Sequence, residues 1–190
     1  MNAFDPATHT YSMDGRIVPS VTQVLKETGF IDTSHYAPGA AERGTAVHEM
    51  LALSDCQRLD LSSIGEDLAG YLLAWTRFRL AMHLNWPCMR IEMPEYGIAG
   101  YAGTPDRVLH ERMLVLDIKS GDIEWWVKYQ LAGYVALVDG GAYGWHGMAV
   151  AVRADGTYTT KCYDGAEIAA AKKVFRSALS VCQCIRAKGG

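Results

Sequence analysis

The sequence predicts an α/β fold, in which helices cover the faces of a mixed β-sheet. Segments whose apolar residues recur with helical spacing alternate with short segments of alternating aliphatic residues, which are typical of strands. Strands and helices interleave in the second half of the chain, and this order gives a mixed sheet with helices on its faces. The chain has 190 residues, which favours one domain with a sizeable core.

The first half of the chain is expected to hold a hairpin and three helices. The hairpin turns at Asp14-Gly15, and Ser20 offers an N-cap to the short helix that follows. Gly29 would end that helix, and the third helix would run to about Asn85. The expected ranges are 8–19 for the hairpin and 21–27, 40–53 and 66–85 for the helices.

The second half is expected to hold the sheet. The expected strands are 89–94, 98–109, 113–119, 144–152 and 157–163, and the expected helices are 124–138 and 165–187. We therefore expect a single domain over 1–190, with the hairpin and helices in 1–85 and the sheet core in 86–190.

Composition and charge narrow the class of protein. Apolar residues make up 49% of the chain and charged residues 21%, as in an ordinary globular protein. The sequence has no apolar run long enough for a membrane span, and its N-terminus has no features of a signal or transit peptide, so a cytoplasmic protein is expected. The net charge of −3 argues against a general nucleic-acid-coating role but not against an enzyme.

The cysteines do not indicate a metal site. There are five, an odd number, and their scattered spacing fits no familiar zinc pattern. We expect free buried thiols in a reducing compartment. The positions are Cys56, Cys88, Cys162, Cys182 and Cys184.

The most informative segment reads GTPDRVLHERMLVLDIK and ends at Lys119. If the chain turns between Glu111 and Arg112, Asp106 lies opposite Asp117, with Cβ atoms about 4.5–5.5 Å apart. Two carboxylates so close repel each other unless a cation lies between them or one is protonated. Lys119 shares the face of Asp117, so the hairpin predicts a site for a divalent cation and a phosphate. The alternative is an acid–lysine network that only satisfies itself.

At this point the sequence resembles the PD-(D/E)xK nuclease superfamily, in particular its RecB-like branch. Pro105-Asp106 and Asp117-Ile118-Lys119 match the signature of the superfamily. Further matches are the run RGTAVHE, which contains His48; Glu92 on the preceding strand; Gln130 with Tyr134; and the opening PSVT, which resembles that of phage-type and mitochondrial-genome-maintenance-type exonucleases. The fold implied by this resemblance is a restriction-endonuclease-like core.

The resemblance also implies the roles of the site residues. The implied metal ligands are His48, Asp106, Asp117, the backbone carbonyl of Ile118 and, as a further candidate, Glu92. Carboxylates suit Mg²⁺, and Mn²⁺ also accepts an imidazole. The implied catalytic residues are Asp106, Asp117, Lys119, Gln130 and Tyr134. The cysteine positions depart from the pattern of iron–sulfur members, so no iron–sulfur cluster is expected.

The activity implied by the resemblance is that of a stand-alone, metal-dependent DNA exonuclease in recombination, repair or phage DNA processing. Its partners would be single-stranded or duplex DNA ends, with a recombination or single-strand-binding protein as a further candidate and no membrane. Its location would be the cytoplasm of a bacterium or a phage-infected host cell. Two alternatives stay open: a non-catalytic DNA-binding or assembly subunit, and a restriction-type endonuclease. Cleavage polarity, strand preference, the number of metal ions and the oligomeric state also stay open.

Several other residues have both a functional and a plain structural interpretation. Trp125 or Trp126 could stack on a base, although core packing is the simpler expectation. Glu92 could be a solvated acid at the end of a strand. Seven cations could line a DNA path or be ordinary solvated charges: Arg107, Lys128, Arg153, Lys161, Lys172, Lys173 and Arg176.

Overall fold

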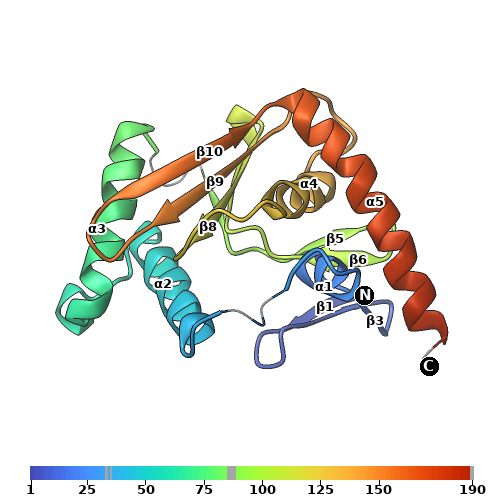
Figure 1. The fold of residues 1–190 in the computed structure, drawn as a ribbon, viewed down its shortest axis with the longest axis horizontal. Coiled ribbons are helices and arrows are strands. Elements are labelled where there is room, and N and C mark those ends of the chain that lie inside the picture. Colours follow the sequence, from blue (N-terminus) through green and yellow to red (C-terminus); the bar gives the residue numbers. More distant parts are fainter. Residues whose placement is uncertain (33, 35, 85–88, 189–190) are drawn as a thin grey trace.

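The computed structural model describes the chain except for residues 33, 35, 85–88 and 189–190 (Figure 1). Its centre is a five-stranded sheet with the strand order β10-β9-β8-β7-β4. Strands β8 and β9 are parallel, and the other neighbours are antiparallel. The strands are β4 (Arg90–Ile91), β7 (Arg107–Leu109), β8 (Leu114–Lys119), β9 (His146–Val152) and β10 (Tyr158–Tyr163). The expected mixed sheet is confirmed.

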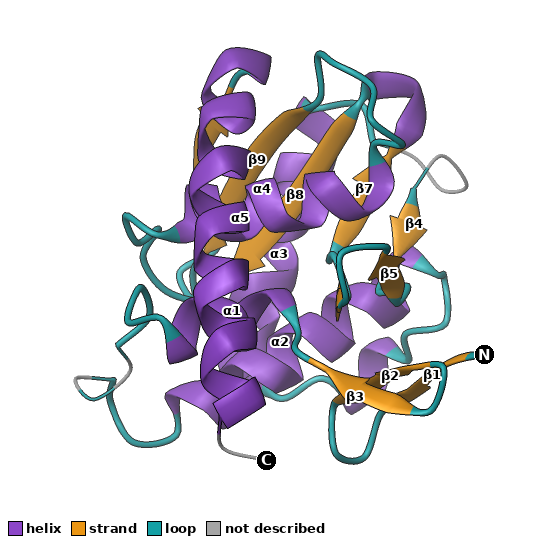
Figure 2. Cartoon of the chain, turned by 90° about the vertical axis from the view of Figure 1, so that its right-hand side faces the viewer, coloured by secondary structure: helices purple, strands orange, loops and turns teal. Residues whose placement is uncertain are grey.

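Helices cover both faces of this sheet, as Figures 1 and 2 show. Helices α2 (Ala40–Asp55) and α3 (Glu66–Ala81) share one hydrophobic core with the sheet. Helices α1 (Val21–Glu27), α4 (Val127–Val138) and α5 (Gly165–Lys188) share a second core on the opposite face. The expected α/β class with helices on both faces is therefore confirmed. None of the described helices is both long enough and apolar enough to cross a bilayer.

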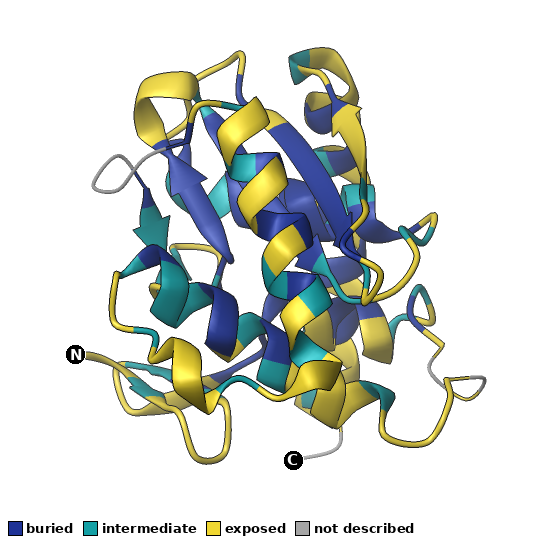
Figure 3. Ribbon diagram, turned by 90° about the vertical axis from the view of Figure 1, so that its left-hand side faces the viewer, coloured by how far each residue is buried: buried dark blue, intermediate teal, exposed yellow. Residues whose placement is uncertain are grey.

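Strand β8 is buried on both faces because apolar side chains alternate between the two cores. Figure 3 shows buried strands in the middle of the molecule, with exposed segments around them. Leu116 and Ile118 pack with α2 and α3, whereas Val115 packs with α4. Side chains two residues apart share a face, so Asp117 lies on the α4 side, next along from Val115. Asp117 is therefore a carboxylate in a buried strand, and its neighbours Leu116 and Ile118 are buried as well.

The N-terminal segment forms a small separate sheet of β1 (Asn2–Asp5), β2 (Thr10–Met13) and β3 (Arg16–Val18). The expected hairpin is confirmed, with Asp14 and Gly15 at φ 48° and 77° in its turn. Strand β1 is an additional strand that the sequence analysis did not predict. Ser20 caps α1 as expected, and Gln23 completes the capping box.

The expected strand over 98–109 is wrong, because two strands in different sheets occupy this range. Strand β6 (Tyr101–Gly103) pairs with β5 (Glu95–Gly97), whereas β7 pairs with β4 and β8. Pro105 lies between β6 and β7, and proline has no N–H to donate to a ladder. The break lets the chain leave one sheet and enter the other just before Asp106.

Other expected boundaries differ by a few residues. Helix α3 ends at Ala81, and the expected end near Asn85 lies outside the described residues. Strand β4 stops at Ile91 because Glu92 has a left-handed backbone, with φ of 48°. The turn between β7 and β8 is a short 3₁₀ helix, η2 (His110–Arg112), and another, η1 (Leu61–Ser63), precedes α3.

We expect Gly70→Ala in α3 to lower the free energy of unfolding by about 1–3 kcal/mol. Alanine is normally the better helix former by about 1 kcal/mol. At this position, however, a Cβ would fall on the backbone carbonyl oxygen of Ala154. Urea denaturation measures the change.

The matched control is Gly44→Ala in α2, where a Cβ would lie 3.6 Å from Ser120 Oγ, an ordinary contact. This variant should be at least as stable as the wild type. If Gly70→Ala were equally stable, the close packing of α3 on the turn between β9 and β10 would be contradicted.

Candidate active site and metal centre

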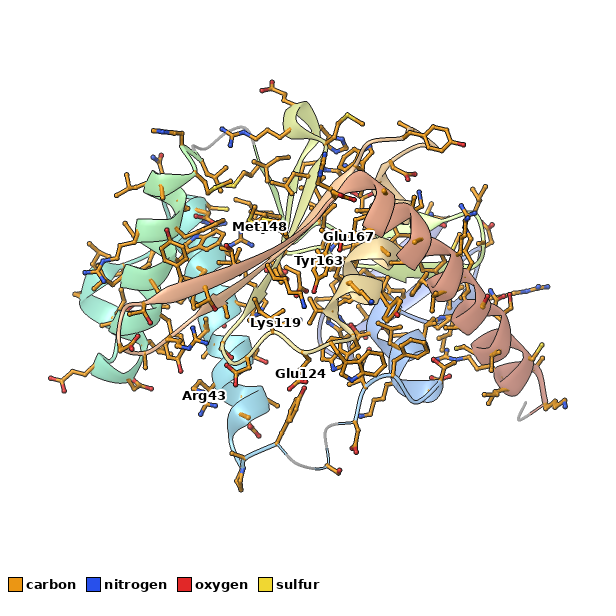
Figure 4. The ribbon with its side chains drawn as sticks, turned by 45° about the horizontal axis from the view of Figure 1, so that its top comes forward. Arg43, Lys119, Glu124, Met148, Tyr163 and Glu167 are labelled. Atoms are coloured by element: carbon orange, nitrogen blue, oxygen red, sulfur yellow. The ribbon has the colours of Figure 1, made fainter. Side chains whose placement is uncertain are left out.

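A cleft of about 890 Å³ opens where α2, the end of β8 and α4 meet. The structure brings all the side chains of the expected site to its walls. These side chains are His48, Glu92, Asp106, Asp117, Lys119, Gln130 and Tyr134. They come from segments far apart in the sequence, so it is the tertiary fold that brings them together. Figure 4 labels Lys119 at the end of β8, and in this view Arg43 of α2 and Glu124 of the β8–α4 loop lie at the same edge of the molecule.

The register of the central hairpin places the two aspartates. The observed partners are Arg107 with Leu116, Val108 with Val115, and Leu109 with Leu114, and these pairs confirm the expected register. Strand β7 begins at the residue after Asp106. The Oδ2 of Asp106 accepts a hydrogen bond of 2.5 Å from the N–H of Ile118. Asp106 is therefore fixed to the backbone of β8 beside Asp117.

Three side chains form a cluster that fits a divalent cation. One ligand atom each from His48, Glu92 and Asp106 lies within 4.8 Å of the others. The His48 Nδ1 is 3.3 Å from Asp106 Oδ1 and 3.7 Å from Glu92 Oε1. Two carboxylates and one imidazole suit Mn²⁺, and Mg²⁺ is favoured by the carboxylates. Helix α2 thus supplies the nitrogen, and the residues that adjoin β4 and β7 supply the oxygens.

The charges in this cluster depend on one another. The negative charge of Asp106 raises the pKa of His48 to about 10, and Glu92 adds to the rise. Burial of the imidazole acts in the opposite direction and lowers this pKa. Burial alone would raise the pKa of Asp106, but the nearby His48 imidazolium holds it below its usual value. Burial raises the pKa of Glu92. A cation bound by the same atoms must displace the His48 proton, because imidazole binds metals in its neutral form.

Lys119 lies beside the cluster and is held by three partners. Its Nζ is 2.8 Å from Asp117 Oδ2 and donates a 2.8 Å hydrogen bond to Gln130 Oε1. The same ammonium lies 5.2 Å from the ring centre of Trp126. Lys119 keeps 20% of its side chain exposed and lines the cleft. It can therefore reach a bound molecule while its position is fixed.

Asp117 is almost fully buried, with a side chain that is 2% exposed. Burial raises its pKa to about 6, while Lys119 lowers the pKa and Asp106 raises it. Because His48 also affects this pKa, Asp117 is within electrostatic reach of the cluster. The side chain contacts Lys119, and a ligand role for Asp117 or for the Ile118 carbonyl stays a prediction.

Helix α4 holds Gln130 against Lys119. The Nε2 of Gln130 donates to the hydroxyl oxygen of Tyr134 at 3.2 Å, one helical turn further on. Burial raises the pKa of Tyr134, so this hydroxyl stays protonated. Gly103 makes room for the ring, because a Cβ there would lie 2.9 Å from Tyr134 Cε1. The chain Tyr134–Gln130–Lys119 is thus set by packing on both sides.

A buried ion pair that the sequence analysis missed lies under the cluster. Arg107 has no exposed surface, so neither of its two interpretations, a place on a DNA path or an ordinary solvated charge, is correct. Its Nε donates to Asp55 Oδ2 at 2.6 Å. Its Nη1 donates to the backbone oxygen of Asp106 at 2.6 Å and to Glu92 Oε1 at 3.3 Å. Arg107 therefore orients two of the three candidate ligands.

Asp55 receives further support from α3. Its Oδ1 accepts hydrogen bonds from Trp75 Nε1 at 2.9 Å and from Arg79 Nη1 at 2.6 Å. One signal for its role was present in the sequence. Asp55 follows Val47 and Leu51 at intervals of four residues, so this acid lies on the apolar face of α2. A buried acid requires a buried cation.

Glu92 carries backbone strain at the edge of the cluster. Its φ of 48° is uncommon for a side chain other than glycine, asparagine or aspartate. Its N–H donates to the backbone oxygen of Asp106 at 3.1 Å, which holds this conformation. Strain of this kind costs on the order of 1–3 kcal/mol and is concentrated at functional sites. Glu92 is half-buried, not a fully solvated strand-end acid.

The other expected cations do not gather at the cleft, and none of the seven lines it. Arg153 pairs with Asp122, and Lys172 pairs with Asp139. Lys128 and Lys161 lie over tyrosine rings. Lys173 and Arg176 line a separate pocket between α4 and α5.

The described cysteines are free thiols, as expected, although not all are buried. Cys182 is buried, Cys56 is partly buried, and Cys162 and Cys184 are exposed. Cys88 lies outside the described residues.

Comparisons with known proteins concern the fold. No protein-family model matches the sequence, and a search of curated proteins finds no match. Among solved structures, an alkaline exonuclease (LHK-Exo) from Laribacter hongkongensis aligns with 90% of this chain and 92% of its own, at 14% identity and a TM-score of 0.42. LHK-Exo in complex with dAMP covers 90% and 93% at 13% identity and a TM-score of 0.41. The structure of SSO0001 covers 83% and 66% at 16% identity and a TM-score of 0.40. Values this low carry no inference about activity, which must come from the residues of the cleft.

We expect the protein to bind Mn²⁺ with an affinity that rises with pH. The pKa of His48 is about 10, so the neutral imidazole is the minor form at pH 7 and the metal must displace a proton. The affinity should rise by about tenfold per unit between pH 7 and 9. Titration calorimetry in buffers of different ionisation enthalpy measures both affinity and proton release.

His48→Gln and Glu92→Gln should each weaken Mn²⁺ binding by at least about tenfold, and His48→Gln should also remove much of the pH dependence. Glu42→Gln, an exposed acid on the same helix as His48, is the matched control and should bind normally. Equal affinity in all these variants would show that the cluster is not the metal centre.

Proposed function

We propose that the protein is a metal-dependent DNA nuclease, which hydrolyses phosphodiester bonds from DNA ends. The observation that carries this proposal is the juxtaposition, in one cleft, of the His48–Glu92–Asp106 cluster with the Lys119 ammonium. A divalent cation and a lysine side by side are suited to a phosphate, which has two or more oxygens to share between them.

His48, Glu92 and Asp106 would hold the cation, joined by Asp117 and the Ile118 carbonyl according to the resemblance to PD-(D/E)xK nucleases. The bound Mg²⁺ or Mn²⁺ supplies a Lewis acid that activates water and offsets negative charge on the phosphoryl group. Arg107 keeps the carboxylate of Glu92 and the backbone of Asp106 in place for this role. No described histidine or carboxylate outside His48, Glu92 and Asp106 belongs to a comparable group of three.

Lys119 would act on the scissile phosphate. Its ammonium donates hydrogen bonds to a phosphate oxygen or to the attacking water, and it offsets the charge that develops in the transition state. Gln130 and Asp117 hold the ammonium in place at 2.8 Å each, so little reorganisation is needed. With a pKa of about 6, Asp117 is largely ionised at neutral pH, so its carboxylate can hold the Lys119 ammonium in position.

The choice of DNA and of its ends rests on the resemblance to the RecB-like branch, in which Gln130 and Tyr134 match the distinguishing motif. A role in recombination, repair or phage DNA processing, with a recombination or single-strand-binding protein as partner, follows from the same resemblance. The net charge of −3 argues against a general nucleic-acid coat but not against an enzyme that acts on DNA.

Asp117→Asn and Lys119→Met should each reduce cleavage of labelled DNA in Mg²⁺ or Mn²⁺ by at least about 100-fold. Both variants should keep the wild-type circular dichroism spectrum, since each keeps the size of its side chain. Excess EDTA should abolish wild-type cleavage. Rates are measured by gel electrophoresis of the products.

Asp155→Asn in the exposed β9–β10 turn and Lys188→Met at the end of α5 make the same chemical changes away from the cleft. Both controls should cleave at the wild-type rate. Full activity of Asp117→Asn or Lys119→Met would exclude the mechanism, and a wild-type protein that binds DNA without cutting it would favour a non-catalytic subunit.

We also expect the protein to degrade linear oligonucleotides and to leave covalently closed circular DNA intact, because an exonuclease requires an end. Oligonucleotides labelled at the 5′ or the 3′ end, single-stranded and duplex, report the polarity and the strand preference. Cutting of the closed circle would favour a restriction-type endonuclease.

A further inference from the structure

We propose that Trp125, together with Phe30 and Tyr129, forms a stacking platform for an unpaired nucleobase of single-stranded DNA. This inference rests on the proposed nuclease function and specifies which form of DNA is bound beside the cleft. It starts from one observation: Trp125 keeps 59% of its surface exposed, although it lies between the catalytic strand and a buried helix.

The three rings form a compact and ordered group. Phe30 and Trp125 are stacked, with ring centres 5.6 Å apart and an angle of 29° between their planes. Tyr129 meets Phe30 edge-on at 5.1 Å and Trp125 edge-on at 6.1 Å. Phe30 and Tyr129 are partly buried and pack against the core, so they support Trp125 from behind. The indole is therefore held rigidly while much of its surface faces solvent.

The two adjacent tryptophans have different roles. Trp126 is 8% exposed and belongs to the core, where its ring lies under the Lys119 ammonium. Trp125 lies on the outside of the same turn and is available to a ligand. Trp125 is thus next in sequence to the residue whose ring contacts the Lys119 ammonium.

The loop after β8 leads from Lys119 in the cleft to the platform. Ser120, the first residue after β8, faces Gly44 of α2, where an added Cβ would lie 3.6 Å from its Oγ. Glu124 then leads into Trp125, and Figure 4 shows Glu124 below Lys119 at this edge. The loop from Ser120 to Trp125 therefore connects the cleft wall directly with the aromatic group.

The chemistry of the surroundings favours a nucleotide over a purely apolar partner. The Lys128 ammonium lies 4.9 Å from the centre of the Tyr129 ring, at the side of the platform. A flat aromatic surface with the Lys128 ammonium beside it matches a base attached to a phosphate. Stacking on the indole requires an open base face, which unpaired bases offer along the whole strand and a duplex offers only at its ends. The platform therefore favours single-stranded DNA.

The test compares the Asp117→Asn protein with the double variant Asp117→Asn, Trp125→Ala. Both carry Asp117→Asn so that the DNA stays intact. Fluorescence anisotropy measures the binding of two probes, a short oligothymidylate and a base-free tetrahydrofuran oligomer of equal length. Trp125→Ala should weaken oligothymidylate binding by about 5- to 100-fold, because stacking is lost, and should leave the base-free probe unchanged within about twofold. Trp125→Phe should keep most of the affinity.

Tyr143→Ala is the matched control, because Tyr143 is 92% exposed and lies beyond the other end of α4. It should bind both probes normally. Equal losses on both probes, or no loss on oligothymidylate in a variant with an unchanged melting temperature, would overturn the platform. Wild-type cleavage is measured separately. Cleavage without the Trp125 effect would refute the platform alone, and the Trp125 effect without cleavage would refute the nuclease alone.

Discussion

The buried ion pair between Asp55 and Arg107 is the constraint on which the candidate site depends. Asp55 ends the helix that carries His48, and Arg107, the residue after Asp106, begins β7. Their 2.6 Å contact therefore fixes α2 against β7 and sets the distance between the imidazole and the carboxylate. Breaking a buried pair of this kind typically costs about 3–5 kcal/mol, because the remaining charge has no partner. The His48–Glu92–Asp106 cluster faces the cleft, and the Asp55–Arg107 pair that supports it is fully buried.

The second half of the site is organised by a different kind of contact. Lys119 and Gln130 are brought together by the crossover from β8 through α4 to the parallel strand β9. In a crossover between two parallel strands, the connecting helix packs on a face of the sheet that the strands form. Helix α4 therefore lies over β8. One half of the site thus depends on a buried charge pair, and the other depends on chain topology and close packing.

Much of this arrangement was predictable from sequence because it follows from local rules. Alternation of apolar residues and a short turn determine which residues of the β7–β8 hairpin face each other, so Asp106 and Asp117 could be paired in advance. The burial of Arg107 could not be predicted in this way, because its partner Asp55 is 52 residues away and appears as one polar residue in an amphipathic helix. The left-handed backbone of Glu92 was also missed, since tertiary contacts impose it against local preference. The split of the expected 98–109 strand had a visible signal in Pro105, because proline has no N–H to donate to a strand ladder.

The contact between the two ends of the chain has a consequence for the order of folding. Arg186 on α5 donates to Glu27 on α1 at 3.0 Å, across 159 residues of sequence. Both helices belong to the core that covers the α4 face of the sheet. Long-range contacts form late, because a large loop must close before they contribute. During synthesis, α1 and β8 emerge long before α5, so the face of the sheet that supports Lys119 stays uncovered until α5 has been made. The geometry around Lys119 would therefore be complete only after α5 has packed against α1 and α4.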